Sequence, residues 1–317
     1  MQHLVRRSYD RAALLSAHPP RLRHPHKQKI FALAPPPTAG AIHYARFAPI
    51  ALPERVPSAR PALTVRPTVF EYPAESAGIW HVNFADPQLF IAYGSALLAQ
   101  DELQVLEHPI LGSVREALLA EDLPAVTEEN NRPTPVLVVG AERSFDFDTA
   151  PDIERPLGLY GNRFAMASFE HVQSALRVID PPTQTNLIAM AAPVGNGKYS
   201  NGQIERVLVT AFTAFSAAIA ESRARWPDAS VEVRTGFWGC GAFGGNRTVM
   251  VLLQILASRL AGVDRLFFYT VSEDGIADVE RGVAELESLT PKGDELVASL
   301  VDRIARRGFS WGTSDGN

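Results

Sequence analysis

A glycine-rich segment, residues 235 to 246, carries the clearest chemical signal in this chain. It reads Thr-Gly-Phe-Trp-Gly-Cys-Gly-Ala-Phe-Gly-Gly-Asn, and five of its twelve residues are glycine. Glycine lets a backbone adopt positive φ and approach a ligand closely. The segment lies between a predicted strand and a helix expected to begin near Arg247, whose unpaired N–H groups and dipole favour an anion. The pattern therefore predicts a phosphate or diphosphate site.

The expected ligand contacts in this segment are Gly239, Cys240, Gly241, Ala242, Phe243, Gly244, Gly245 and Asn246. The segment matches neither the P-loop nor the dinucleotide fingerprint. Cys240 is expected to pack as a small residue, because no histidine lies nearby in the sequence to activate a nucleophile. Phe243 either stacks on a ribose or is a buried aromatic. Asn246 either contacts the ligand or simply caps the following helix.

A second group, Gln100-Asp101-Glu102, lies near the start of an amphipathic helix predicted over residues 97–106. If both carboxylates face one pocket, the charge of Asp101 raises the pKa of Glu102 and keeps a proton on it near neutral pH. Gln100 would then orient one of them. The alternative is that both acids only complement the helix dipole.

These groups need a scaffold, and apolar runs along the chain predict one. Strands are expected at residues 79–84, 135–139, 187–192, 231–234 and 266–271, and helices at 97–106, 204–220, 249–260 and about 296–304. Such an alternation predicts an α/β fold with helices on both faces of a mostly parallel or mixed sheet.

The first 75 residues differ from the rest, since they hold 12 of the 24 prolines and five of the eight histidines. We predict a proline-rich basic extension over residues 1–75, wrapping a main domain over residues 76–317, with one short helix near residues 9–16. His18, His24 and His26 have no cysteine or acidic residue beside them, so no metal and no cofactor is expected.

Bulk composition narrows the class of protein. A net charge of −5 argues against a general nucleic-acid-binding surface. A single cysteine, Cys240, excludes an intrachain disulfide and favours a reducing compartment, so a cytoplasmic location is expected. No apolar run long enough to predict a membrane span is evident in the sequence.

Several segments resemble poly(ADP-ribose) glycohydrolases. Residues 235–246 are close to that family's Thr-Gly-Asn-Trp-Gly-Cys-Gly-Ala-Phe-Gly-Gly-Asp, and residues 82–86 resemble its Val-Asp-Phe-Ala-Asn. Gln100-Asp101-Glu102 falls where the family has Gln-Glu-Glu. The resemblance runs from about residue 79 to residue 271. It implies a macrodomain, a three-layer α/β/α fold with a mixed central sheet that binds ADP-ribose.

The resemblance also assigns roles. It places the general acid on Glu102, Asn83 near the adenine end, Asp86 at a ribose, and Tyr160 in the region of an aromatic residue that closes over the ligand. Phe145 and Phe147 compete with Tyr160 for that role. The implied activity is hydrolysis of an ADP-ribosyl bond by acid and base catalysis, and the implied partners are ADP-ribose or ADP-ribosylated proteins.

One departure from the family is large. Where the family has three consecutive glycines before the Gln-Glu-Glu, this chain has Phe90, Ile91 and Ala92. Bulky residues there predict a rebuilt ribose-side loop and favour mono-ADP-ribosyl over polymeric substrates. The alternative function is a macrodomain that binds ADP-ribose without chemistry.

Overall fold

A computed structural model of the chain describes residues 1–291 and 293–316. An eight-stranded mixed sheet forms its centre, in the order β1-β2-β7-β8-β4-β9-β10-β3, and a separate hairpin pairs β5 with β6. The strands are β1 (His3–Asp10), β2 (Ala41–Phe47), β3 (Ala62–Arg66), β4 (Ile79–Ala85), β5 (Glu128–Glu129), β6 (Arg132–Pro133), β7 (Val136–Phe147), β8 (Leu176–Ala191), β9 (Glu232–Gly236) and β10 (Arg265–Tyr269). Neighbours from β8 through β4, β9 and β10 to β3 are parallel, and the other pairs of the sheet are antiparallel.

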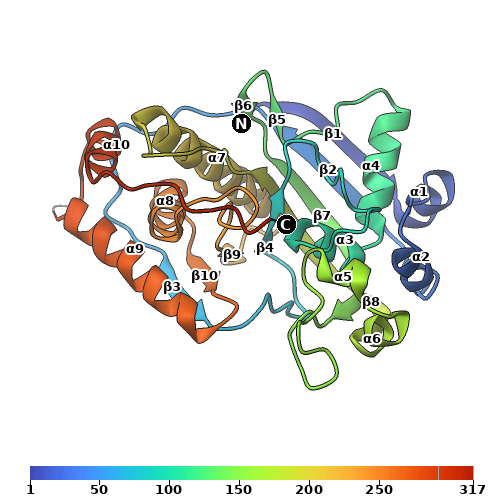
Figure 1. The fold of residues 1–317 in the computed structure, drawn as a ribbon. Helices are drawn as coiled ribbons and strands as arrows, with labels where there is room; N and C mark the ends of the chain where they lie inside the picture. The colour runs from blue at the N-terminus through green and yellow to red at the C-terminus, as the bar shows by residue number, and fades with distance from the viewer. Residues whose placement is uncertain (292, 317) are drawn as a thin grey trace.

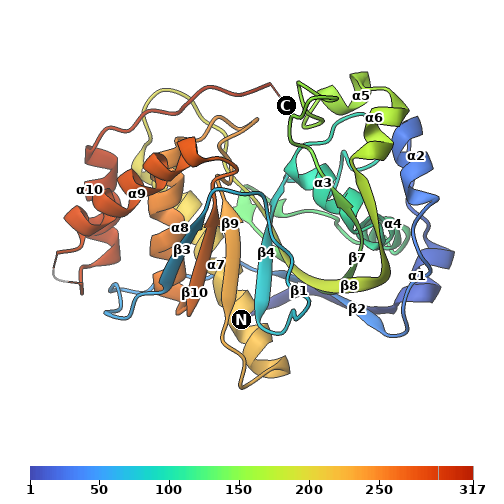
Figure 2. The same ribbon diagram turned by 90° about the horizontal axis from the view of Figure 1, so that it is seen from below.

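Helices cover both faces of the sheet (Figures 1 and 2). They are α1 (Arg11–Ala17), α2 (Pro25–Phe31), α3 (Gln100–Glu107), α4 (Ile110–Ala120), α5 (Arg163–Met166), α6 (Phe169–Ser174), α7 (Asn201–Arg225), α8 (Arg247–Ala261), α9 (Ile276–Leu289) and α10 (Val297–Arg306). The largest buried apolar cluster joins one face to α7 and α8, with α9 and α10 outside them. A second cluster joins the other face to α1 and α4. The predicted three-layer α/β/α architecture is confirmed.

The helix α7 is the one described helix whose length and composition would also suit a membrane span. Within its most apolar window, 67% of the helix is buried inside the protein. Its apolar side chains contact the sheet and α8, which explains the composition as that of a core helix.

The sequence predicted that the first 75 residues wrap the outside of the main domain, and this prediction is wrong. These residues supply β1, β2 and β3 to the central sheet, so they are part of the same domain. The prolines lie between these strands: Pro61 precedes β3 and Pro67 follows it, while Pro25 is the first residue of α2. Proline is tolerated at these boundaries because no ladder or helix hydrogen bond is lost there.

The strands predicted at residues 135–139 and 187–192 belong to longer strands, β7 and β8. The first half of β8 contains Pro181 and Pro182, which argued against a strand. Residues 186–191 of β8 pair with β4 on one side, but the first half pairs only with β7. That half is a sheet edge, where proline costs no ladder bond.

The sheet opens at the end that carries the predicted site. β4 pairs with β9 only from Ile79 to His81, whereas β9 continues beside β10 to Gly236. Past His81 the two central strands therefore separate at their carboxyl ends. Crevices of this kind are the usual place for ligands in open α/β sheets. The chain leaves β4 toward α3, and leaves β9 into the glycine-rich segment.

Candidate functional site

The side chain of Gln100, the first residue of α3, fills the gap that β9 leaves beside β4. Its Oε1 accepts a hydrogen bond from Phe84 N at 2.7 Å, and its Nε2 donates to Val82 O at 3.2 Å. Two backbone groups of β4 thus remain satisfied although no strand lies beside them. Gln100 fixes the start of α3 against the sheet, which is a positioning role and extends the predicted one.

Asp101 and Glu102 are both buried and face different partners. Asp101 Oδ1 accepts a hydrogen bond from Asn83 Nδ2 at 3.1 Å, on the sheet side of α3. Glu102 Oε2 accepts from Ala99 N at 3.1 Å, one turn back along its own chain. Glu102 therefore caps the first turn of α3, as the alternative interpretation expected. Asn83 is fully buried beneath Asp101, so the side chain expected near adenine supports a carboxylate instead.

Burial dominates the electrostatics of this pair. It raises the pKa of Asp101 well above its ordinary value, and the Glu102 carboxylate raises it further. Burial also raises the pKa of Glu102, while Lys27 and the capping hydrogen bond oppose the shift and Asp86 adds to it. A carboxyl group with a raised pKa keeps a larger protonated fraction toward neutral pH, which is the property that a general acid needs.

Asp86 is half-buried at the end of β4. Its Oδ1 accepts a hydrogen bond from Gln88 N at 2.8 Å, and its backbone oxygen accepts one from the Thr127 hydroxyl at 2.8 Å. These bonds shape the turn into the loop that precedes α3. The negative charge of Asp86 raises the pKa of Glu102, so the two carboxylates lie near enough to interact.

A buried lysine that the sequence did not single out, Lys27 of α2, holds that loop. Its Nζ donates hydrogen bonds to Tyr93 O at 2.8 Å and to Leu97 O at 2.6 Å. Two backbone N–H groups, of Arg23 and His24, donate to Gly94 O at 2.8 and 3.0 Å. Burial lowers the pKa of Lys27 to about 8, opposed by the negative charges of Glu102 and Asp101. No sequence signal predicts this contact, because α2 and the loop are joined only by the fold.

The residues that replace the family's glycines adopt an unexpected geometry. Phe90 has φ of +54° and is fully buried in the second apolar cluster, while Ile91 is exposed. The left-handed conformation is thus kept at Phe90 although a Cβ is present, at a cost that burial of the ring helps to offset. Ile91 does not face the inside, and Arg115, Tyr93 and the α2 region carry the rest of the rebuilt loop.

Tyr160 lies at the start of α3. Its hydroxyl accepts a hydrogen bond from Gln100 N at 3.1 Å, at the N-terminus of α3. Burial raises its pKa to about 12, with smaller contributions from Asp315 and Glu102. Paired backbone bonds between Leu98 and Gly161, at 3.2 and 2.9 Å, fasten its loop to the start of α3. Phe145 and Phe147, the competing aromatics, belong to a buried cluster below.

The glycine-rich segment links β9 to α8 as predicted. Asn246 caps α8, since its side chain accepts a hydrogen bond from Val249 N at 3.2 Å. Phe243 is half-buried against the main cluster, and burial raises the pKa of Cys240 to about 12, which suits a packed thiol and not a nucleophile. Ala242 is exposed, whereas Gly244 and Gly245 are buried.

Residues 310–316, which we call the strap, lie across this segment (Figure 2). Asn246 Nδ2 donates to Ser310 O at 3.0 Å, and Asn162 Nδ2 donates to Gly316 O at 3.2 Å. Between these anchors, a Cβ built on Gly241 would lie 3.0 Å from Asp315 Oδ2, and one built on Gly244 would lie 3.2 Å from Ser314 N. The strap therefore crosses from the glycine-rich segment to the loop that carries Tyr160.

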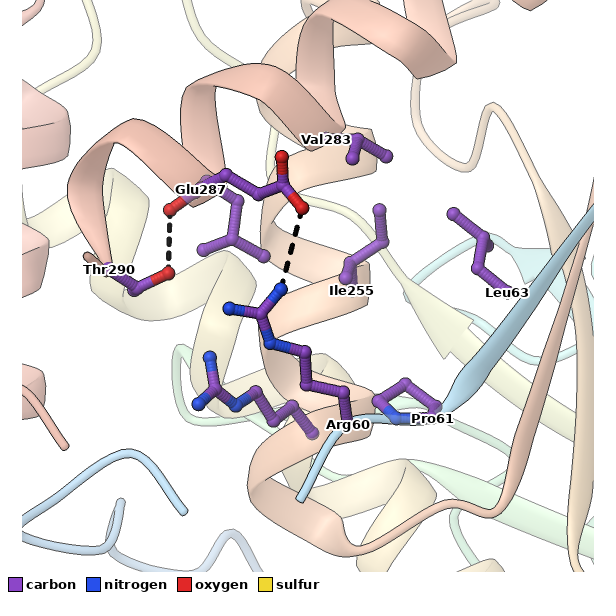
Figure 3. Close-up of a pocket in the computed structure, with 9 residues that line it drawn as sticks. Arg60, Pro61, Leu63, Ile255, Val283, Glu287 and Thr290 are labelled. Atoms are coloured by element: carbon purple, nitrogen blue, oxygen red, sulfur yellow. Dashed lines mark hydrogen bonds and ion pairs between the residues drawn. The ribbon is translucent and has the colours of Figure 1, made fainter. Parts of the chain in front are cut away.

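A cavity lies elsewhere, beside the edge strand β3 and between α8 and α9 (Figure 3). It has a volume of about 190 Å³ and is walled by Leu63, Ile255 and Val283. At its mouth Arg60 Nη1 and Glu287 Oε1 form an exposed ion pair at 3.4 Å. The cavity contains no unpaired buried polar atom that would orient a ligand. Among the described residues, no cluster of His, Cys, Asp and Glu suits a metal ion.

A family model matches residues 155–278 of the chain. Its description is poly(ADP-ribose) glycohydrolase, macro domain fold. The matched residues include Tyr160, the glycine-rich segment, α8 and β10, and begin after Glu102. Over these residues the chain is similar to poly(ADP-ribose) glycohydrolases. The resemblance that the glycine-rich segment carried is confirmed there, whereas Gln100-Asp101-Glu102 lies outside the matched residues.

Other known proteins agree with this match. A probable poly(ADP-ribose) glycohydrolase 2 from Arabidopsis thaliana is 31% identical over 106 residues, covering 29% of this chain and 20% of that protein. The chain thus spans about a fifth of the length of this curated relative.

Two crystal structures of poly(ADP-ribose) glycohydrolases are also similar to this chain. The Thermomonospora curvata enzyme bound to the inhibitor ADP-HPD is 13% identical, with a TM-score of 0.44 and coverage of 86% of this chain and 88% of that one. The Deinococcus radiodurans enzyme in complex with ADP-ribose is 12% identical, with a TM-score of 0.44 and coverage of 89% and 95%.

Proposed function

We propose that this protein is an ADP-ribosyl hydrolase that releases ADP-ribose from modified proteins. The observation that carries the proposal is that two segments with suitable chemistry border the same opening, between the carboxyl ends of β4 and β9. We call these two segments the walls of the crevice. One wall is the glycine-rich segment, within the family match, and the other is the buried Glu102 at the start of α3. Tyr160 lies next to the second wall, with its hydroxyl at the start of α3.

The proposed chemistry is glycoside hydrolysis. Glu102 donates a proton to the oxygen that leaves the anomeric carbon, and the bond between that carbon and the oxygen breaks. The Glu102 carboxylate then takes a proton from the attacking water, whose oxygen bonds to the anomeric carbon. The products are ADP-ribose and the freed protein side chain. The raised pKa of Glu102 supports the first step.

The residues around Glu102 have supporting roles in this proposal. Asp101 accepts a hydrogen bond from Asn83, and Gln100 fixes the start of α3 against β4. Asp86 lies near enough to Glu102 to raise its pKa. The glycine-rich segment would bind the diphosphate, with its backbone N–H groups and the N-terminus of α8 as donors.

We further propose that mono-ADP-ribosyl groups are preferred over polymer. Two features support this preference: a phenylalanine, Phe90, stands where the resembled family has glycine, and Lys27 holds the loop from residue 93 to residue 97 in place. The competing function is a non-catalytic reader of ADP-ribose. It draws support from the hydrogen bond that holds Glu102 on Ala99, since that carboxylate must turn to reach a substrate.

One pair of measurements separates these functions. Calorimetry with ADP-ribose measures binding, and chromatography of a mono-ADP-ribosylated protein and of poly(ADP-ribose) incubated with the chain measures released product. The hydrolase proposal predicts binding together with ADP-ribose release that is faster from the mono-modified protein. Binding without any product on either substrate would establish a reader, and absence of binding would reject both.

A further inference from the structure

The strap occupies the position that the proposed function reserves for a ligand. It leaves α10, passes over the glycine-rich segment and ends beside the loop of Tyr160, where Figure 2 shows it crossing from one half of the molecule to the other. Its contacts are mostly with backbone. A Cβ built on Gly312 would lie 3.4 Å from the carbonyl oxygens of Gly244 and Gly245. The strap is thus as close to this segment as a bound ligand would be.

The strap is packed tightly at Trp311 and has fewer contacts beyond it. Trp311 stacks on Tyr199 with ring centroids 4.2 Å apart and an interplanar angle of 11°, and its backbone N donates to Gly197 O at 2.8 Å. Tyr199 in turn accepts a hydrogen bond from Asn246 N at 2.9 Å, which connects Trp311 to the start of α8. Beyond Trp311 the strap residues are small or polar and largely exposed. The outer part can therefore move while Trp311 stays in place.

Asp315 brings a carboxylate of the strap to the glycine-rich segment. Its carboxylate lies against Gly241, in the segment whose glycines and following helix N-terminus favour an anion. It also lies close enough to Tyr160 to affect the titration of the phenol. An anionic oxygen of the chain itself thus stands between the glycine-rich wall and the wall of Tyr160 and Glu102, where the diphosphate of ADP-ribose would be.

We propose that Asp315 is a specificity-determining residue: its carboxylate competes for the anion-binding segment, and the strap must be displaced by the diphosphate of the ligand. This inference rests on the proposed function, because it assumes that the glycine-rich segment binds ADP-ribose. Ligands that carry phosphate meet the competing charge, whereas a nucleoside does not reach it. The strap therefore acts as a built-in competitor and makes the site respond to the charge of its ligand.

The test compares three forms of the protein by calorimetry: the full-length wild type, full-length Asp315→Asn, and a chain shortened after Trp311. Each is titrated with ADP-ribose, ADP and adenosine. Removing the charge or the strap is expected to strengthen binding of ADP-ribose and ADP by about 10-fold, and to leave adenosine unchanged. Asp228→Asn, an exposed carboxylate in the turn after α7, is the control and should match wild type.

A second readout follows the strap directly. Hydrogen exchange of residues 312–316 in wild type should accelerate when ADP-ribose is added. Equal affinities in all forms, with binding present, overturn the strap proposal and leave the proposed function standing. Absence of ADP-ribose binding in every form overturns both, since removal of the strap then uncovers no site.

Discussion

Glu102 and Asp101 are neighbours in the chain, yet the helix directs them to different partners. Asp101 lies against Asn83 of β4, and Glu102 turns back to the amide of Ala99. Adjacent helix positions do not face one another, so their coupling acts through the shared buried environment and not through a direct hydrogen bond. Lys27 is the cation that offsets this concentration of negative charge.

Replacing Lys27 tests that balance. Lys27→Met removes a positive charge that lowers the pKa of Glu102, so that pKa should rise. The limb of the pH–rate profile that reports Glu102 is then expected to move to higher pH. Loss of the two bonds to Tyr93 O and Leu97 O should also speed hydrogen exchange in the loop before α3.

Lys29→Met on the same helix is the matched control, because Lys29 is exposed and lies over the ring of Phe169. It should change neither the pH profile nor the exchange. A Lys27→Met protein with an unaltered profile would show that Lys27 does not influence Glu102.

At the scale of elements, the separation of β4 from β9 creates the site. β9 follows β10 instead of β4 beyond Arg234, and Gln100 at the start of α3 takes over the abandoned edge of β4. The same helix start receives the hydroxyl of Tyr160. One helix N-terminus therefore fixes the strand, the acidic pair and the aromatic loop together.

Gln100→Ala should weaken this junction. The backbone groups of Val82 and Phe84 would lose their partner, and we expect the free energy of unfolding to fall by about 1–2 kcal/mol. Urea denaturation followed by fluorescence measures the change. Gln203→Ala, which removes a side chain from the first turn of α7, gives the cost of an ordinary capping residue for comparison. A smaller loss for Gln100→Ala than for this control would contradict its role at the opening.

Elements that depend only on residues close together in the chain were predictable from the sequence. The glycine-rich segment, the cap at Asn246 and the strand before it act within a few residues, and the structure confirms them. The first half of β8 was missed because Pro181 and Pro182 lie on an edge that only the sheet order reveals. The second half of β7 was missed because it continues past Gly140 into a polar stretch. The strands β1, β2 and β3 were missed because prolines between strands look like prolines within them.

The site was predictable only in part. The residue types and their spacing were enough to predict Glu102, Asp101 and the glycine-rich segment as site residues. The roles of Gln100 and Asn83 were not predictable, because they depend on which strand lies beside β4. Lys27 and the strap contact the site across large sequence separations, which no spacing pattern encodes. The amino-acid sequence shows a basic arm and a polar tail at these positions, and only the folded structure reveals the burial of Lys27 and the contacts of the strap with the glycine-rich segment.

At the scale of the molecule, buried charge makes stability depend on pH. Burial lowers the pKa of His81 and of His108 to about 3, below the value near 6.5 of an unfolded chain. Between these values the unfolded state binds more protons, so stability is present above pH 6.5 and is lost as the pH falls toward 3. Raised carboxyl pKa values, such as that of Glu107, act in the opposite direction.

A histidine variant isolates the first effect. Between pH 7 and pH 5, each buried histidine should remove about 2 kcal/mol from the free energy of unfolding. His108→Asn retains a donor for Gln104 O, which the His108 ring meets at 2.7 Å, but cannot titrate. Between pH 7 and pH 5, the free energy of unfolding of this variant should fall by about 2 kcal/mol less than that of wild type. Parallel pH dependences of the two proteins would contradict a neutral, buried His108.

The central claim is that Glu102 performs acid and base chemistry on an ADP-ribosyl bond. The most direct measurement is ADP-ribose release from a mono-ADP-ribosylated protein by wild type and Glu102→Gln, with ADP-ribose affinity measured in parallel. We predict loss of release with binding kept within about threefold, since glutamine keeps an acceptor for Ala99 N but cannot transfer a proton. Glu205→Gln, an exposed carboxylate on α7, should behave as wild type. Unchanged turnover in Glu102→Gln would remove Glu102 from the mechanism.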